Sequence, residues 1–325
     1  MKKDIKIVIF IAIILLLSVS FAIINIFINK GETQIDLTED RVVEVYSKIK
    51  LSEFISIKNG KLLNNDYVDT LTVGKKEIKY SYLDNNDNKH DDSFSIEIVD
   101  TTKPYVGLSK NYTYVIGSDF NLLETTFCGD NVTVDPECII VGEYDLEKVG
   151  KYPLIFRATD ESGNTREVNF TLNVVDKRST SSSSKITFEE INNRLSSDAV
   201  LMIDVSKWQE DIDWKKVKDS GIDYAMLRLG TQKGIDQDSV IDSYFDKNIK
   251  EARNAGIKVG VYYFTYANDI EDADIQAEWV IDALKDYEID LPVAFDWECW
   301  NFFDRFDINF YELNMIADTF LVHKS

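Results

Sequence analysis

The sequence has 325 residues, of which 57 are Asp or Glu and 36 are Lys or Arg. The resulting net charge of −21 argues against nucleic acid as a partner and favours a chain that stays in solution. The two histidines have no metal-ligand spacing, so we expect neither a metal site nor a cofactor.

The chain begins with an apolar segment. Ile7–Ile28 contains only three polar residues and is long enough to cross a bilayer as a helix. Lysines at positions 2, 3 and 6 precede it, which predicts a cytoplasmic N-terminus. A cleaved signal peptide is the alternative, although residues 18–22 offer a poor cleavage site. We therefore predict a single-pass cell-membrane protein, with its cytoplasmic tip and anchor in residues 1–30 and its bulk extracellular.

Two stretches of similar length, 31–102 and 103–177, follow with the same pattern of short alternating strands. In the second stretch, Lys151–Asp160 and Arg166–Asp176 flank the turn ESGN, which predicts a hairpin with one buried face. The predicted inward side chains are Tyr152, Leu154, Phe156, Val168, Phe170 and Leu172. Both stretches resemble the bacterial immunoglobulin-like repeats of surface proteins, which implies two tandem all-β sandwich modules.

These modules contain two turn aspartates and a pair of cysteines that could form specific bonds. Asp84 and Asp160 lie in turns, where we expect them to be solvated, with calcium binding as the alternative. Cys128 and Cys138 are ten residues apart and could form a disulfide across a hairpin in an oxidising exterior. Cys299 would then be a lone thiol.

A Ser-rich segment, Arg178–Lys185, predicts a flexible linker over residues 178–198. After it, apolar strand patterns alternate with helical patterns through residues 199–325, which predicts a parallel sheet with right-handed crossovers. The strands are predicted at 199–205, 224–230, 258–267 and 291–298, and the helices at 213–221, 243–256, 271–287 and from 308 onward.

Carboxylates close the first and last of these strands. Asp296 and Glu298 are two residues apart and therefore point to the same face, and Asp204 ends the first strand. At the C-terminal end of a barrel strand, that face opens on the active-site mouth. Two carboxylates there can divide into a proton donor and an anion, as glycosidic bond cleavage requires, whereas a solvated acidic turn is the alternative. Aromatic neighbours and the nearby carboxylate predict a raised pKa for Glu298.

The motifs IDVSKWQEDIDWKKVKDSGIDYAMLRLG, GVYYFTYA and VAFDWE resemble the glycoside hydrolase family 25 (Chalaropsis-type) lysozymes. The resemblance implies an α/β barrel that hydrolyses the bond between N-acetylmuramic acid and N-acetylglucosamine in peptidoglycan glycan strands. It implies that Glu298 is the general acid, that Asp296 is the neighbouring stabilising carboxylate and that Asp204 is the carboxylate at the floor of the site.

The same resemblance places groove-lining aromatics at Tyr262, Tyr263 and Tyr266. Core packing is the alternative for each, and alternation puts Tyr262 and Tyr263 on opposite faces of their strand. Arg228 could pair with one of the site carboxylates, with a purely structural ion pair as the alternative.

The chain also departs from the family pattern. Residues 199–325 provide four strands where a complete barrel has eight, and they lack the family's late aspartate and Trp-Gln-Tyr motif. We therefore expect a TIM-like (β/α) barrel that is incomplete at its C-terminus and weak or inactive by itself. Two functions follow: a membrane-anchored muramidase for cell-wall remodelling or lysis, or a non-catalytic cell-surface or wall-binding protein with a remnant barrel.

Overall fold

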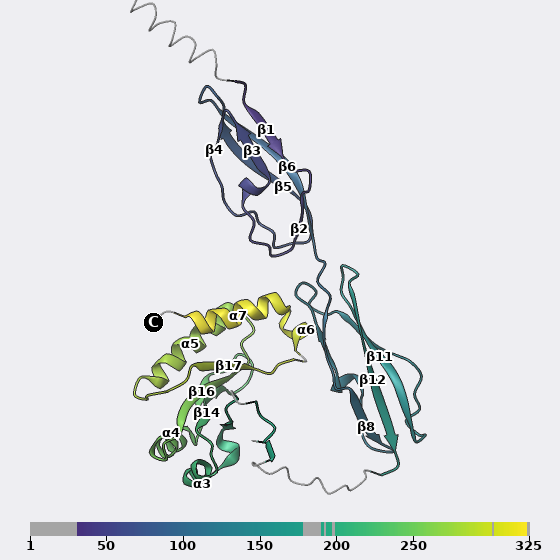
Figure 1. Ribbon diagram of the computed structural model, residues 1–325, viewed down its shortest axis with the longest axis vertical. Helices are drawn as coiled ribbons and strands as arrows, with labels where there is room; N and C mark the ends of the chain where they lie inside the picture. The colour runs from purple at the N-terminus through teal and green to yellow at the C-terminus, as the bar shows by residue number, and fades with distance from the viewer. Residues whose placement is uncertain (1–30, 178–189, 192, 197–198, 301, 324–325) are drawn as a thin grey trace, which may run out of the picture. The chain divides into compact units, whose positions relative to one another are not determined.

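The computed structural model describes residues 31–177, 190–191, 193–196, 199–300 and 302–323 (Figure 1). The chain divides into two compact units, Met1–Thr101 and Thr102–Ser325. Within the described residues, no helix has both the length and the apolar character that a membrane crossing requires. This finding corrects the predicted single-pass membrane topology and localisation. The segment on which they rested, Ile7–Ile28, lies outside the described residues.

The first unit contains a small all-β module. Its strands are β1 (Gln34–Leu37), β2 (Val42–Glu44), β3 (Ile55–Lys58), β4 (Lys61–Leu62), β5 (Gly74–Leu83) and β6 (Lys89–Val99). One sheet has the order β2-β6-β5-β4, and β1 pairs with β3 separately. Alternation along the long β5–β6 hairpin buries Tyr80, Phe94, Ile96 and Ile98 on one face.

A second all-β module opens the second unit. Its strands are β7 (Tyr105–Gly107), β8 (Asn111–Val115), β9 (Phe127–Gly129), β10 (Glu137–Val141), β11 (Gly150–Thr159) and β12 (Thr165–Val175). The order β8-β12-β11-β10, with a separate β7–β9 pair, repeats the first module strand for strand. In both modules the two longest strands form an antiparallel hairpin, β5–β6 and β11–β12. In both, the edge strand beside the second of them, β2 or β8, pairs parallel to it.

The predicted hairpin of this module is confirmed. β11 and β12 pair antiparallel, with Leu154 opposite Phe170 and Phe156 opposite Val168. Leu154, Phe156, Phe170 and Leu172 are buried, whereas Tyr152 and Val168 are half-buried at the ends of the same face. Cys128 and Cys138 form a disulfide with Cα atoms 6.5 Å apart, linking β9 to β10.

The rest of the second unit is a sheet with helices packed on it. Its elements are β13 (Met202–Val205), α3 (Trp214–Asp219), β14 (Tyr224–Gln232), β15 (Ser239–Ile241), α4 (Phe245–Asn254), β16 (Lys258–Thr265), α5 (Ile270–Leu284), β17 (Val293–Trp297), α6 (Phe303–Phe306) and α7 (Phe310–Val322). The predicted alternation of strands and helices is confirmed, and β15 and α6 are additions to it.

Four parallel strands run in the order β13-β14-β16-β17, and β15 pairs antiparallel with β14. The helices α4 and α7 pack on these strands, and α5 packs on α7 (Figure 1). The described residues therefore form an open sheet, which corrects the predicted TIM-like barrel. The physical reason is strand number, because closure with filled interior packing takes about eight strands.

Capping residues explain where the helices begin and end. The Asp213 side chain accepts a hydrogen bond from the Lys216 N–H, and Asp269 does the same for Asp272. Before α7, Asn309 and Glu312 form a reciprocal capping box. Gly221 follows α3 with φ of +95°, a backbone conformation that favours glycine.

The second β-module contacts the start of α7 directly. The Phe310 N–H donates to the carbonyl of Asp130 at 2.8 Å, and the Asn309 side-chain amide donates to the carbonyl of Val132 at 3.0 Å. Phe127 from β9 packs against the rings of Phe303 and Phe310. These contacts join the β-module to the sheet domain, whereas the predicted linker segment 178–185 lies outside the described residues.

Candidate functional site

The strand register determines which side chains share the open face of the parallel sheet. Asp204 lies beside Met226, and Arg228 lies beside Tyr262 on the next strand. Phe264 then lies beside Asp296 on β17. Because side chains alternate along each strand, these residues project from one face, and Glu298, directly after β17, continues the same alternation. The predicted carboxylates therefore lie on one face at the C-terminal ends of their strands.

Asp296 is the most strongly perturbed carboxyl of the site. Its pKa is raised to about 6 by partial burial and, to a smaller extent, by the negative charges of Glu298 and Asp204, against an opposing effect of Arg228. These interactions show that the three predicted carboxylates act on one another electrostatically. Glu298 is exposed, so its aromatic neighbours in the sequence do not bury it.

Tyr262 connects to Asp204 on the same face. Asp204 and Ser206 are its polar neighbours there, and the Asp204 charge acts on its hydroxyl. Burial and the Asp204 charge raise the pKa of Tyr262, so the phenol keeps its proton and remains a donor. Ser206 was missed at the sequence level, although it has the same alternation parity as Asp204.

Arg228 forms a buried ion pair with Asp242 instead of pairing with a predicted site carboxylate. Its Nε donates to Asp242 Oδ2 at 2.7 Å, and the two side chains are 11% and 1% exposed. The backbone N–H groups of Lys207 and Tyr244 also donate to Asp242, each at 3.0 Å. The structural ion pair that was the alternative is therefore present. Asp242 carries no local sequence signal, since it pairs only through the fold.

The two other predicted aromatics lie differently from Tyr262. Tyr263 is 0% exposed, stacks on Phe320 and hydrogen-bonds through its hydroxyl to Ser239 at 2.5 Å. It therefore belongs to the core between sheet and helices and does not line the open face. Tyr266 follows β16, is half-buried and packs edge-to-face against Phe264.

Aromatic side chains and a thiol surround the end of β17. Trp297 is buried and packs edge-to-face against Trp300, which is 46% exposed. Cys299 is buried, and this burial, together with a smaller effect of the Glu298 charge, raises the pKa of its thiol to about 11. A neutral, buried thiol there is a packing group and no nucleophile.

Comparison with known proteins finds similarity in this part of the chain. Residues 203–318 match the family model "Glycosyl hydrolases family 25", so this part of the chain is similar to that family. The match spans the sheet, the three predicted site carboxylates and most of α7.

Individual relatives match the same part. Lysozyme M1 from Streptomyces globisporus is 38% identical over 66 residues, which are 20% of this chain and 21% of the relative. The uncharacterized protein YegX from Escherichia coli is 32% identical over 99 residues, 30% of this chain and 35% of that protein. A family 25 glycosyl hydrolase structure from Bacillus anthracis is 28% identical with a TM-score of 0.29, covering 38% of this chain and 55% of that one. The chain thus spans about a third or less of the curated relatives.

Proposed function

We propose that this protein is a peptidoglycan muramidase that hydrolyses the bond between N-acetylmuramic acid and N-acetylglucosamine. The observation that supports this best is Asp296, whose pKa of about 6 reflects partial burial beside Glu298 and Asp204. Glycosidic hydrolysis uses two carboxyl groups, one of which donates a proton while the other carries charge near the sugar ring. The three carboxylates lie within the residues that match the glycosyl hydrolase family 25 model, which supports a glycan as the substrate.

Proton donation belongs to Glu298 in this proposal. It follows the last residue of β17 and is exposed, so it can reach the glycosidic oxygen of a long polymer lying across the sheet edge. The proton passes from the Glu298 carboxyl to that oxygen while the bond from the oxygen to the muramic acid C1 breaks, and a water molecule then supplies the hydroxyl at C1 and releases a proton that restores the acid. Bound glycan would cover Glu298 and exclude water around it.

Asp296 and Asp204 stabilise the positive charge that develops on the sugar ring in the transition state. Asp296 is anionic above about pH 6 and lies next to the donor, where it stabilises the cation-like ring or its N-acetyl group. Asp204 interacts with the Tyr262 hydroxyl on the same face. Arg228 moderates the accumulated negative charge while it remains paired with Asp242.

Product analysis tests this proposal. The full chain is incubated with purified peptidoglycan, and the products are reduced with borohydride and separated. A muramidase exposes a reducing N-acetylmuramic acid, so muramitol should accumulate with the wild type and stay at background with Glu298→Gln. Glucosaminitol in its place would assign the other glycosidic bond. Retained binding to peptidoglycan without any new reducing end would instead support a non-catalytic wall-binding protein.

A further inference from the structure

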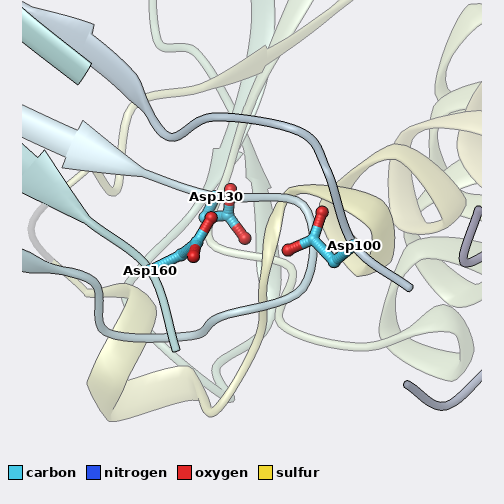
Figure 2. Close-up of side chains that lie close together, drawn as sticks. All are labelled: Asp100, Asp130 and Asp160. Atoms are coloured by element: carbon cyan, nitrogen blue, oxygen red, sulfur yellow. The ribbon is translucent and has the colours of Figure 1, made fainter. Parts of the chain in front are cut away.

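Two acidic side chains of the second β-module are buried side by side, away from the hydrolase site. Asp130 follows β9 and Asp160 follows β11, and they are 2% and 6% exposed. One carboxylate oxygen of each lies within 4.8 Å of the other (Figure 2). Asp100, also drawn there, is the second-last residue of the first unit. We propose that Asp130 and Asp160 bind a divalent cation of the calcium class.

The hydrogen bonds of Asp130 leave one oxygen available. Its Oδ2 accepts the N–H groups of Val132 and Thr133, each at 2.9 Å. Its Oδ1 is buried and has no hydrogen-bond partner. A buried carboxylate oxygen without a donor is costly, and a cation is the partner that would satisfy it. This unsatisfied atom is an observation separate from the proximity of the two acids.

Asp160 is held in place by its turn but is not neutralised. Its Oδ1 accepts the Asn164 N–H at 2.8 Å and its Oδ2 accepts the Asn164 side-chain amide at 2.9 Å. Among the ion pairs of the described residues, none joins a Lys or Arg to Asp130 or to Asp160. Two buried negative charges this close repel each other strongly, because the protein interior screens them poorly.

The donor chemistry selects a hard cation. Only carboxylate oxygens converge here, and the module's cysteines are joined as a disulfide. Calcium binds six to eight oxygens at about 2.3–2.6 Å, so one ion midway could contact both oxygens. Backbone carbonyls and water commonly complete such a shell. Soft thiolate-binding or imidazole-binding metals find no ligand of their preferred kind in this pair.

The first module provides an internal comparison. Asp84 occupies the turn position of Asp160 and accepts the Asn88 N–H at 2.9 Å and the Asn88 side-chain amide at 3.0 Å. Its Oδ2, however, contacts His90 at 2.9 Å, and its side chain is 16% exposed. The turn thus has the same hydrogen bonds in both modules. Asp84 contacts a histidine, whereas Asp160 lies beside a second buried carboxylate, that of Asp130. The expected solvation of the turn acids is wrong for Asp160, since its side chain is buried.

A bound cation would also stiffen the attachment of the hydrolase domain. The loop around Asp130 contacts the turn of Asp160, because the Glu161 N–H donates to Thr133 Oγ1 at 3.1 Å. The same loop accepts the hydrogen bonds of Phe310 and Asn309 at the start of α7. An ion between the two carboxylates would therefore restrain the loop to which α7 is bonded.

Calcium titration of the full chain tests the site. After chelator treatment, isothermal calorimetry with CaCl₂ should show one site per chain with a Kd on the order of 10⁻⁴–10⁻³ M, as in extracellular calcium modules. Asp130→Asn and Asp160→Asn keep a hydrogen-bonding oxygen and should weaken binding at least about tenfold, since each removes a charged ligand. Asp84→Asn is the matched control and should bind as the wild type does.

Hydrogen exchange on the unmodified protein provides a test without substitutions. Calcium should slow exchange of the amides of residues 131–133 and of Phe310. No calcium binding by the wild type would overturn the proposal, as would equal weakening by Asp84→Asn and Asp160→Asn. Binding that leaves these amides unchanged would place the ion elsewhere. Equal binding of Mg²⁺ and Ca²⁺, insensitive to Asp130→Asn and Asp160→Asn, would indicate only screening of the net charge of −21 and would overturn it too.

Discussion

The two faces of the parallel sheet differ although they are built from the same strands. On the helix-covered face, Val261, Tyr263 and Thr265 are 0% exposed and pack in the core. On the open face, the alternate residues Tyr262 and Asp296 interact with charged groups. Neighbouring residues of one strand thus lie on opposite faces, one in the core that stabilises the fold and the next on the face of the proposed active site. Substitutions on the covered face should chiefly change folding, and those on the open face should chiefly change catalysis.

The largest expected effect is on the open face, at the proposed proton donor. Glu298→Gln should reduce the rate of peptidoglycan hydrolysis by about a hundredfold to ten-thousandfold, the usual contribution of general acid catalysis. Because Glu298 is exposed, the free energy of unfolding should change by no more than about 0.5 kcal/mol. Initial rates of reducing-end release and urea denaturation measure the two quantities. Glu278→Gln, on the exposed side of α5, is the matched control and should alter neither.

Adjacent tyrosines on β16 give the next largest contrast. Tyr263→Ala removes a fully buried ring and should lower the free energy of unfolding by about 3–5 kcal/mol, the usual cost of truncating a buried aromatic. Tyr262→Ala removes a half-buried ring and should cost clearly less stability while slowing hydrolysis. Urea unfolding of both variants decides the matter. Equal losses of stability would contradict the division between the two faces.

Arg228 is an exception to the division between the two faces, because it lies on the open face and yet forms a buried ion pair with Asp242. Arg228→Gln leaves Asp242 as a buried charge without its cation and should lower the free energy of unfolding by about 3 kcal/mol. It should also move the pKa of Asp296 upward from about 6, since the opposing positive charge is lost. Unfolding at pH 7 and carboxyl titration by NMR measure these effects. A stable variant would mean that Asp242 is satisfied by its backbone donors alone.

The smallest effect concerns the pH dependence of stability. The pKa of Asp296 rises from 3.8 to about 6 on folding, so the folded state loses stability as pH rises through that interval. Asp296→Asn removes this loss. Because the side chain is half-buried, solvent screening should limit the gain at pH 7 to about 1 kcal/mol. The difference from wild type should vanish near about pH 2.5, where Asp296 is neutral in both states. Urea unfolding at both pH values is the check, and a gain of equal size at both would exclude this electrostatic cause.

Local patterns in the sequence predicted the strands, the helices and the shared face of the site carboxylates. Alternation places Asp296 and Glu298 together, and it also separates Tyr262 from Tyr263 as the structure does. Alternation does not say which of those two faces the helices cover. The family resemblance therefore placed both tyrosines in the groove, whereas Tyr263 packs in the core.

Features that depend on distant residues could not be predicted in this way. The pairing of Arg228 with Asp242 arises because β15 folds back on β14. The buried Asp160 lies beside Asp130, which is thirty residues earlier in the sequence in a loop with no periodic pattern. Neither residue's own neighbours in the chain reveal these partners, since burial is a property of tertiary packing.

The contacts between α7 and the second β-module have a consequence for proteolysis. The hydrogen bond from Asn309 to Val132 joins residues 177 positions apart, and the ring of Phe127 adds apolar contact with Phe303 and Phe310. The Ser-rich segment 178–185 lies between these partners in the sequence. A protease that cuts there would break the chain without breaking these contacts. The two fragments should then migrate together as one particle under native conditions and separate only in denaturant.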